Sequence, residues 1–348
     1  MSGTYKKIAV LRANALGDFI LSLPAIEALK NAHSEAEVVL LGRKTHSELY
    51  QKRRWPIDRV IPLPSHLKFD ETLKEESEER EALIESLRAE KFDLIVQLHG
   101  GGGYSNLFIN ELNAKFSVGA KSKSAPELSL NTSYVENQHE TIRQMEIVQK
   151  VGAKIGELVP HFSASQEETE LAKELFLKGS SSTKVLINPG ATDPKRRWPV
   201  KKFVFICEEI LKRGATVFIN IGPNEEEIAW EIKKHLLNSE RLIFVTPKLY
   251  ELTGLLSLCD LVLSNDTGTL HLALALQRPT IGLFWFKNLL TYGPLTSFQN
   301  KMFTSWETTC QECGQNCCIK NCTHDSSIIA SIPEEEVMDA VFEFLNLK

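Results

Sequence analysis

Long apolar runs are absent from this 348-residue sequence. A membrane-spanning helix needs roughly 18 consecutive apolar residues, and the longest candidate, from Leu272 to Phe286, is interrupted by the polar stretch from Gln277 to Pro279. The N-terminal residues also lack the apolar core of a secretory signal, because the short run from Ile8 to Leu11 is followed at once by Arg12. We therefore expect a soluble, cytoplasmic protein.

A large charge of either sign is also missing. The chain carries 40 Lys and Arg against 45 Asp and Glu, a net charge of -5, and the cations are spread along its length. Nucleic-acid binding needs clustered positive charge, so we expect no nucleic-acid partner. No strongly basic amphipathic helix predicts membrane binding either, and any membrane contact would have to be peripheral.

Alternating strand and helix patterns fill most of the sequence, which predicts an α/β fold with parallel sheets. The length exceeds the ~100 to 200 residues of a typical domain, so we expect two domains sharing a cleft. We place an N-terminal domain at 1–165, and a second at 180–333 that includes a Cys-rich segment at 310–324. A last helix, 334–348, could pack back on the N-terminal domain.

Apolar runs predict strands in both halves, at 7–11, 37–42, 60–64, 92–100, 184–190, 215–222, 241–246, 260–266 and 278–285. Helical spacing predicts helices at 25–32, 69–90, 200–211, 223–237, 249–259 and 269–276. The polar segment 162–184 separates the two halves. Because ligands bind beyond the carboxyl ends of parallel strands, we expect the chemistry in the strand-to-helix loops.

The first such loop, RANALGD, ends in Gly17 and Asp18. Gly17 permits a tight turn, and Asp18 falls at the start of a helix. Two interpretations remain open. Asp18 caps the helix, where a carboxylate is favoured, or it faces a ligand as a general base that takes a proton from an acceptor hydroxyl.

A basic loop, NPGATDPKRRWP, follows the strand that opens the second half. It holds three consecutive cations, Lys195 to Arg197, before the next helix. Backbone amides from Gly190 to Thr192, together with Arg196, suit a diphosphate, which needs convergent donors and positive charge. The alternative is a solvated basic turn.

Two further loops of the second half carry acidic residues at helix starts. After Gly222, Glu225 and Glu226 either stabilise the first turn of a helix or accept hydrogen bonds from ribose hydroxyls. The other loop, SNDTGTLH, presents the next four candidate residues. They are Asp266, Thr267, Gly268 and His271. This loop is either a second phosphate-facing helix start or an ordinary N-cap, with His271 a packed residue.

The loop QLHGGGGYSN has four glycines, Gly100 to Gly103, directly after a strand of the first half. It matches neither a P-loop nor the glycine pattern of a dinucleotide fold in its usual context. We interpret it as an acceptor-side loop, with His99, Gly100 and the earlier Gly17 as its candidate residues.

Five of the seven cysteines lie in CQECGQNCCIKNCTH, near His324. In a cytosolic chain such a cluster favours a metal over disulfides, and C-x-x-C is a usual half-site for a tetrahedral ion. We predict a structural zinc or iron site of four thiols, Cys310, Cys313, Cys318 and Cys322. Free thiols and a disulfide remain the alternatives.

Three stretches in this order resemble glycosyltransferase family 9, the family of the ADP-heptose:lipopolysaccharide heptosyltransferases. They are ALGDFILSLPAIEALK, PGATDPKRRWP and SNDTGTLHLALALQRPTIGLF, and the likeness extends to IPEEEVMDAV. The resemblance implies a GT-B fold, in which two Rossmann-like domains face a central cleft. It further implies a nucleotide-sugar donor in the second domain, an acceptor in the first, and inverting transfer without a metal; the sequence indeed has no D-x-D motif.

The resemblance also assigns residues. Asp18 matches the family's catalytic base, Thr192 and Arg196 match donor-phosphate contacts, and one of Glu225 and Glu226 matches the ribose-contacting acid. The stretch from Asp266 to His271 matches the family's donor loop, D-[TS]-G-x-x-H. The chain departs from the family at QLHGGGGYS, where many members have Asp-x-Gln-Gly followed by a basic residue.

The sequence therefore predicts a transferase of heptose, from an ADP-linked donor, to a hydroxyl of a lipopolysaccharide core or related glycan. No cofactor is required for this transfer. A lipid-linked acceptor would bring the protein to the cytoplasmic face of the inner membrane. The alternatives are a nucleotide-sugar epimerase or hydrolase on the same fold, and a non-catalytic scaffold that binds nucleotide sugars.

Overall fold

The computed structural model describes residues 5–50, 53, 55–65, 67, 69, 77–178, 183–236, 239–320 and 322–346. The chain divides into two compact units, Met1–Pro160 and His161–Lys348, here called the first and second unit. The sequence places this boundary at residue 165, and the structure places it at Pro160. Within the described ranges, no helix combines the length and the apolar character needed to cross a bilayer.

The first unit contains a parallel sheet with the strand order β3-β2-β1-β4-β5-β6. Its strands are β1 (Lys7–Leu11), β2 (Glu37–Gly42), β3 (Arg59–Pro62), β4 (Leu94–Gln97), β5 (Phe116–Lys121) and β6 (Leu130–Ser133). The central strands β1 and β4 are almost wholly apolar and buried, as strands covered on both faces must be. This confirms the strands predicted at 7–11 and 37–42, and shortens the one predicted at 92–100.

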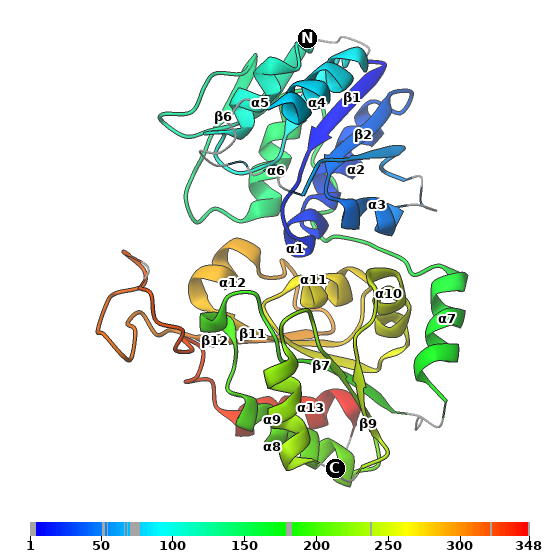
Figure 1. The fold of residues 1–348 in the computed structure, drawn as a ribbon, viewed down its shortest axis with the longest axis vertical. Helices are drawn as coiled ribbons and strands as arrows, with labels where there is room; N and C mark the ends of the chain where they lie inside the picture. Colours follow the sequence, from blue (N-terminus) through cyan, green and yellow to red (C-terminus); the bar gives the residue numbers. More distant parts are fainter. Residues whose placement is uncertain are drawn as a thin grey trace. The chain divides into compact units, whose positions relative to one another are not determined.

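Helices flank this sheet (Figure 1). They are α1 (Leu16–Ile20), α2 (Leu23–Ala32), α3 (Lys44–Tyr50), α4 (Glu78–Ala89), α5 (Ser105–Glu111) and α6 (Glu140–Gln149). The charged helix predicted at 69–90 corresponds to α4, which Ser77 caps by accepting from the Arg80 amide. Residues 70–76 of that prediction lie outside the described residues.

The second unit repeats the same architecture, with the order β12-β11-β10-β7-β8-β9, all parallel. Its strands are β7 (Lys184–Asn188), β8 (Thr216–Asn220), β9 (Leu242–Val245), β10 (Leu261–Asn265), β11 (Thr280–Trp285) and β12 (Asn300–Ser305). Its helical elements are α7 (Gln166–Phe176), the 3-10 turn η2 (Pro194–Arg196), α8 (Val200–Lys212), α9 (Glu226–His235), α10 (Leu249–Leu258), α11 (Gly268–Ala275), α12 (Phe286–Tyr292) and α13 (Glu334–Leu345).

Each sheet has the strand order of a Rossmann fold, in which the winding direction reverses next to the first strand. This reversal falls between β1 and β4 in the first unit and between β7 and β10 in the second. The strand ends beside such a switch point are where open α/β sheets bind ligands. The loops that follow these four strands hold Asp18 and His99 in the first unit, and Arg196 and Asp266 in the second. Each pair therefore shares one edge of one sheet.

The C-terminal helix corrects one expectation. We expected it to pack back on the N-terminal domain, but α13, red in Figure 1, packs on α8, β10 and β11 of its own unit. Val337, Met338 and Val341 are buried in the core of the second unit, together with Ile329 and Ile332 just before the helix. The apolar side of α13 is stabilised by burial, and the second sheet of its own unit provides the surface that buries it.

The polar segment between the two series is also more structured than its composition indicates. It contains α7, whose first turn is closed by a capping box between Ser165 and Glu168. α7 packs along α10, and Gly254 makes this approach possible: a Cβ there would lie 2.0 Å from the Glu168 carbonyl oxygen. The segment therefore belongs to the second unit as a packed helix.

Replacing Gly254 by Ala is expected to lower the free energy of unfolding of the second unit by about 1–3 kcal/mol, the usual cost of overpacking. Urea denaturation followed by tryptophan fluorescence measures this, since four of the five tryptophans lie in that unit. Gly156→Ala is the control, because a Cβ at Gly156 meets nothing within 4 Å. Equal midpoints for both variants would contradict the packing argument.

Candidate active site

Asp18 lies in the first turn of α1 and does not cap it. The N-cap is Ala15, and no side chain makes the cap hydrogen bond. Instead, the carboxylate is held by Arg12, whose Nη2 lies 3.2 Å from Asp18 Oδ1 and whose Nε donates to the Asp18 carbonyl at 3.0 Å. A quarter of the Asp18 side chain is exposed, whereas Arg12 is buried. The capping interpretation is therefore wrong, and the carboxylate is oriented by a buried cation.

A second layer of charges holds Arg12. Its Nη2 lies 4.0 Å from Oε2 of Glu140 on α6, and Nη1 donates to the Leu98 carbonyl. Glu140 in turn accepts from Arg143 at 2.8 Å and from Gln144 at 3.0 Å. Buried charges persist when they are paired and hydrogen-bonded in this way. Neither Arg12 nor Glu140 was predicted from the sequence. For Glu140 the reason is that no local pattern links α6 to the Asp18 loop.

His99 joins the two switch-point loops of the first unit. The amide of Ala13, in the Asp18 loop, donates to His99 Nδ1 at 3.2 Å, so this nitrogen carries no proton. Burial, with the charges of Arg12 and Arg43, lowers the pKa of His99 to about 3. The imidazole is therefore neutral at physiological pH.

The backbone around His99 has the geometry that its glycines allow. Gly100 and Gly102 adopt positive φ values of 68° and 87°, a region that residues with a Cβ rarely occupy. The buried Gln97 closes the turn by accepting from the His99 amide at 2.8 Å.

Arg43, directly after β2, lies beside the Asp18 loop and was not predicted from the sequence. Its Nε donates to the Ala13 carbonyl at 2.7 Å, and its side chain is otherwise exposed. The family pattern led us to look for a cation after the glycine loop, where this chain has none. Its position directly after a predicted strand was the available signal.

Asp266, at the end of β10, is the centre of the polar site in the second unit. Its Oδ2 accepts from Asn288 at 2.7 Å and from Arg196 Nη1 at 3.2 Å, and its Oδ1 lies 3.3 Å from His271 Nε2. Burial by itself raises the pKa of this carboxyl, but His271, Arg196 and Asn288 outweigh burial and hold the pKa below its usual value. The structure thus brings together Arg196, Asp266 and His271, which the sequence placed in separate loops.

Three asparagines hold the loops of this site in place, and the sequence analysis missed all of them. Asn220 donates to Asn188 at 2.7 Å, and Asn188 donates to Thr267 Oγ1 at 3.2 Å. Asn265 donates to the Pro189 carbonyl at 2.7 Å and accepts from the Trp198 amide. A signal was present, because β7, β8 and β10 each end in Asn, and a buried amide at a strand end must find partners.

The Thr267 side chain turns to Asn188 and does not cap α11. The first amides of α11, from Gly268 onward, therefore have no side-chain acceptor at the cap position within the described residues. Free amides at a helix start attract anions, and the helix dipole adds to the attraction.

Glu225 and Glu226 are separated by the structure. Glu225 is half-buried and accepts from the Gly222 amide at 2.8 Å, whereas Glu226 is exposed on α9. The Glu225 carboxylate also occupies the space above Gly190, where a Cβ would lie 1.9 Å from Glu225 Oε1. Glu225 is thus the acid that borders the basic loop.

The three cations of the basic loop have different partners. Arg197 donates to the Ala191 carbonyl at 2.8 Å, and Lys195 donates to the Cys322 carbonyl at 2.5 Å. Only Arg196 meets the acid at the end of β10. The interpretation as a solvated basic turn is therefore wrong. Thr192, in the same loop, is exposed.

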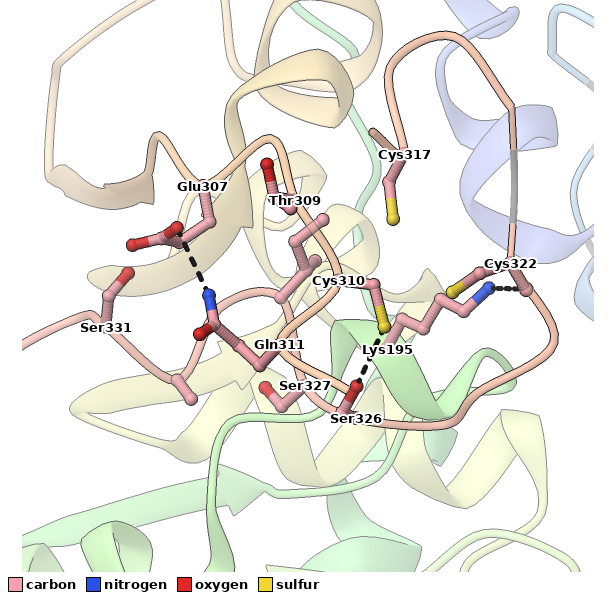
Figure 2. A pocket seen from close by; sticks show the side chains of 12 residues that line it. Lys195, Glu307, Thr309, Cys310, Gln311, Cys317, Cys322, Ser326, Ser327 and Ser331 are labelled. Carbon is pink, nitrogen blue, oxygen red and sulfur yellow. Dashed lines mark hydrogen bonds between the residues drawn. The ribbon is translucent and has the colours of Figure 1, made fainter. Parts of the chain in front are cut away.

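The cysteine cluster differs from the predicted set in one position. Cys310, Cys313, Cys322 and His324 each offer a ligand atom, and these atoms lie within 4.8 Å of one another. Cys318 is not among them, although its sequence spacing included it. The imidazole of His324 stands in this group in place of the Cys318 thiol. Figure 2 shows the sulfur atoms of Cys310 and Cys322 near Lys195 and Ser326.

Two Rossmann-type units, each with polar residues at its switch point, are the components of a GT-B fold, and comparison with known proteins identifies the family. The model of glycosyltransferase family 9 (heptosyltransferase) matches residues 80–324, well over half of the chain. The chain belongs to glycosyltransferase family 9.

Individual relatives agree along nearly the whole length. Lipopolysaccharide heptosyltransferase 1 of Campylobacter coli is 24% identical over 355 residues, covering 97% of this chain and 98% of that protein. The structure of E. coli ADP-heptose lipopolysaccharide heptosyltransferase II superposes with a TM-score of 0.77 at 18% identity, covering 98% of each chain. The E. coli heptosyltransferase WaaC with ADP gives 0.70 at 16% identity, covering 97% and 99%. The GT-B fold expected from the sequence is confirmed.

Proposed function

We propose that this glycosyltransferase moves heptose from ADP-heptose to a hydroxyl group of a lipopolysaccharide core, with inversion and without a metal ion in the reaction. The names of its relatives support the sugar, the donor and the acceptor class. The observation that carries the proposal is that the two switch points present groups of opposite charge. One presents an oriented carboxylate, Asp18, and the other presents a cation, Arg196, beside uncapped helix amides.

The second unit is proposed to bind the donor. Arg196 and the amides of Gly268 and Thr269 take the diphosphate, because convergent N–H donors and positive charge are what this group requires. Thr192 and the Gly190 amide lie on the same loop and add donors. Asp266, with His271, positions the Arg196 guanidinium, and Thr267 holds the start of α11 against Asn188.

The ribose is assigned to Glu225 rather than to Glu226. An acid after the second strand of a Rossmann unit accepts hydrogen bonds from ribose hydroxyls. Glu225 directly precedes α9, next to Gly190 of the phosphate loop, whereas Glu226 is exposed. Of the two candidates left open by the sequence, the half-buried one borders the proposed phosphate site.

In the proposed reaction, Asp18 takes the proton of the acceptor hydroxyl as its oxygen attacks the anomeric carbon. The bond to the diphosphate breaks on the opposite face, which inverts the configuration, and ADP leaves with the electron pair. Arg12 pairs with Oδ1 of Asp18, so Oδ2 is the oxygen assigned to the proton. Arg196 and the helix amides stabilise the negative charge that develops on ADP, a role that needs no metal because the groups are held in place beforehand.

The first unit is proposed to bind the acceptor through Gly17, His99 and Gly100. Arg43 adds an exposed cation beside the Asp18 loop, which suits the phosphate or carboxylate groups of a lipopolysaccharide core. Asn14 Oδ1 is buried in the same loop with no hydrogen-bond partner in the described part of the chain. A hydroxyl of the acceptor would satisfy it. A lipid-linked acceptor places the reaction at the cytoplasmic face of the inner membrane.

The test is to incubate the purified protein with ADP-heptose, with and without a deacylated lipopolysaccharide core oligosaccharide, and to follow ADP and product mass. We expect ADP only when the acceptor is present, together with an oligosaccharide heavier by one heptose. UDP-, GDP- and CDP-sugars are the controls and are expected to remain intact.

Other outcomes would overturn the proposal in distinct ways. ADP release without an acceptor would identify a hydrolase, and an isomerised sugar still linked to ADP would identify an epimerase. ADP binding without turnover across a set of core oligosaccharides would favour a scaffold.

A further inference from the structure

The cysteine cluster lies in a long segment between β12 and α13, outside the residues assigned to the transfer reaction. Cys310 is buried and Cys313 exposed, and both Cys322 and His324 are half-buried. The Cys310 Sγ lies 3.9 Å from His324 Nδ1. All seven cysteines of the chain are free thiols in the structure.

The turn from Cys310 to Gly314 presents the first two thiols side by side. Gly314 adopts a φ of 71°, and its amide donates to the Cys310 carbonyl at 2.9 Å. The two thiols of this C-x-x-C pair therefore lie within 4.8 Å of each other, on one turn of the chain.

The histidine is oriented in the way that metal-ligating histidines are. Its Nδ1 faces the Cys310 sulfur, while Nε2 lies 3.9 Å from Oε2 of Glu312. A carboxylate near the outer ring nitrogen fixes the tautomer that leaves the inner nitrogen free to ligate. Glu312 stands between the two cysteines of the C-x-x-C pair, so one turn supplies two thiols and this carboxylate.

We propose that Cys310, Cys313, Cys322 and His324 bind one zinc ion as a closed, tetrahedral structural site. Three thiolates and one imidazole are a usual structural zinc set, and they leave no open position for catalysis. With Zn–S bonds of about 2.3 Å, tetrahedral geometry puts sulfur atoms about 3.8 Å apart. The present spread of up to 4.8 Å closes onto an ion by movements of about 1 Å. Binding displaces the thiol protons to solvent.

The zinc site also supports the basic loop of the proposed donor site. The Cys322 carbonyl accepts from Lys195 Nζ at 2.5 Å, and the Lys195 carbonyl accepts from the Ile328 amide at 2.9 Å. Figure 2 shows Lys195 reaching across to Cys322, beside a cavity of about 320 Å³ lined by both segments. Since Lys195 precedes Arg196, the metal fixes the segment that orients the phosphate-binding arginine. This consequence rests on the proposed function, whereas metal binding does not.

Elemental analysis of the untagged, full-length protein tests the assignment. We expect about one zinc ion per chain, the stoichiometry of a Cys₃His site. Cys313→Ser and His324→Gln change exposed or half-buried ligands and are expected to lose the ion, and Glu312→Gln to weaken zinc affinity about 10-fold. Cys318→Ser is the matched control, from the same segment, and is expected to keep the zinc.

Three results would overturn the site: zinc at background level with freely reactive thiols, iron in place of zinc, or a mass lower by two hydrogens, which shows a disulfide. Loss of zinc from Cys318→Ser would contradict the ligand set. For the link to the donor site, removal of zinc with a mercurial reagent is expected to weaken ADP binding. Unchanged ADP affinity in metal-free, folded protein would contradict the link, while the zinc content remains an independent measurement.

Discussion

Asp18→Asn is expected to lower kcat for heptose transfer by about 10²- to 10⁴-fold, the range that a positioned general base contributes. The amide cannot take the acceptor proton. It retains an oxygen that can accept from Arg12, whose Nη2 lies 3.2 Å from Asp18 Oδ1, so the local structure is expected to persist. Initial rates with saturating ADP-heptose and acceptor measure the loss, and calorimetry is expected to show unchanged ADP affinity.

Glu35→Gln provides the matched control for this variant. It makes the same change of acid to amide in the same unit, at an exposed position whose side chain meets Ser34. Wild-type transfer by Asp18→Asn would show that the base is elsewhere. A loss of ADP affinity together with rate would show instead that the substitution disturbs the fold, which circular dichroism would detect.

Arg196→Ala is expected to weaken ADP binding by about 10- to 100-fold, because a hydrogen bond to a charged group contributes about 1.5–3 kcal/mol. The side chain pairs with Asp266, which keeps its contacts to Asn288 and His271 in the variant. Loss of the cation therefore removes the proposed phosphate contact, while the remaining contacts of Asp266 persist. Calorimetry with ADP, GDP, UDP and CDP measures the loss and is expected to show selective binding of ADP by the wild type.

Two further variants sharpen this experiment. Lys201→Ala removes a cation from an exposed position at the start of α8 and is expected to bind ADP normally. Arg196→Lys retains the positive charge and is expected to recover most of the affinity. Equal binding by Arg196→Ala and wild type would remove Arg196 from the donor site, and no binding of any nucleotide by the wild type would contradict the donor site itself.

The central strands and the loops after them were predictable from the sequence, because buried parallel strands are nearly continuous apolar runs. β1, β7 and β10 were found in this way, and the polar residues directly after them were correctly placed at helix starts. The strands β5, β6 and β12 were not predicted, because segments such as Asn300–Ser305 mix polar and apolar residues and form no continuous apolar run.

The interaction partners of the candidate site residues could not be predicted from the sequence. Arg12 meets Glu140 because α6 packs beside the first sheet, and Arg196 meets Asp266 because β7 and β10 pair. At the cysteine cluster, spacing alone favoured Cys318, but a loop is free to turn, and the folded segment brings His324 to the fourth position. Such choices depend on contacts between distant segments, which local patterns do not encode.

By itself, the sequence determined the fold class, the resemblance to family 9, and the loops in which Asp18, Arg196 and Asp266 lie. Hydrophobic periodicity and loop motifs are local properties, so they can be recognised in the sequence before the fold is known. The tertiary structure alone decided that Arg12 orients Asp18, that Glu225 rather than Glu226 borders the basic loop, and that Lys195 is hydrogen-bonded to the cysteine segment. Strand order also decides that Arg196 meets Asp266, because only the assembled sheet brings the ends of β7 and β10 to one edge.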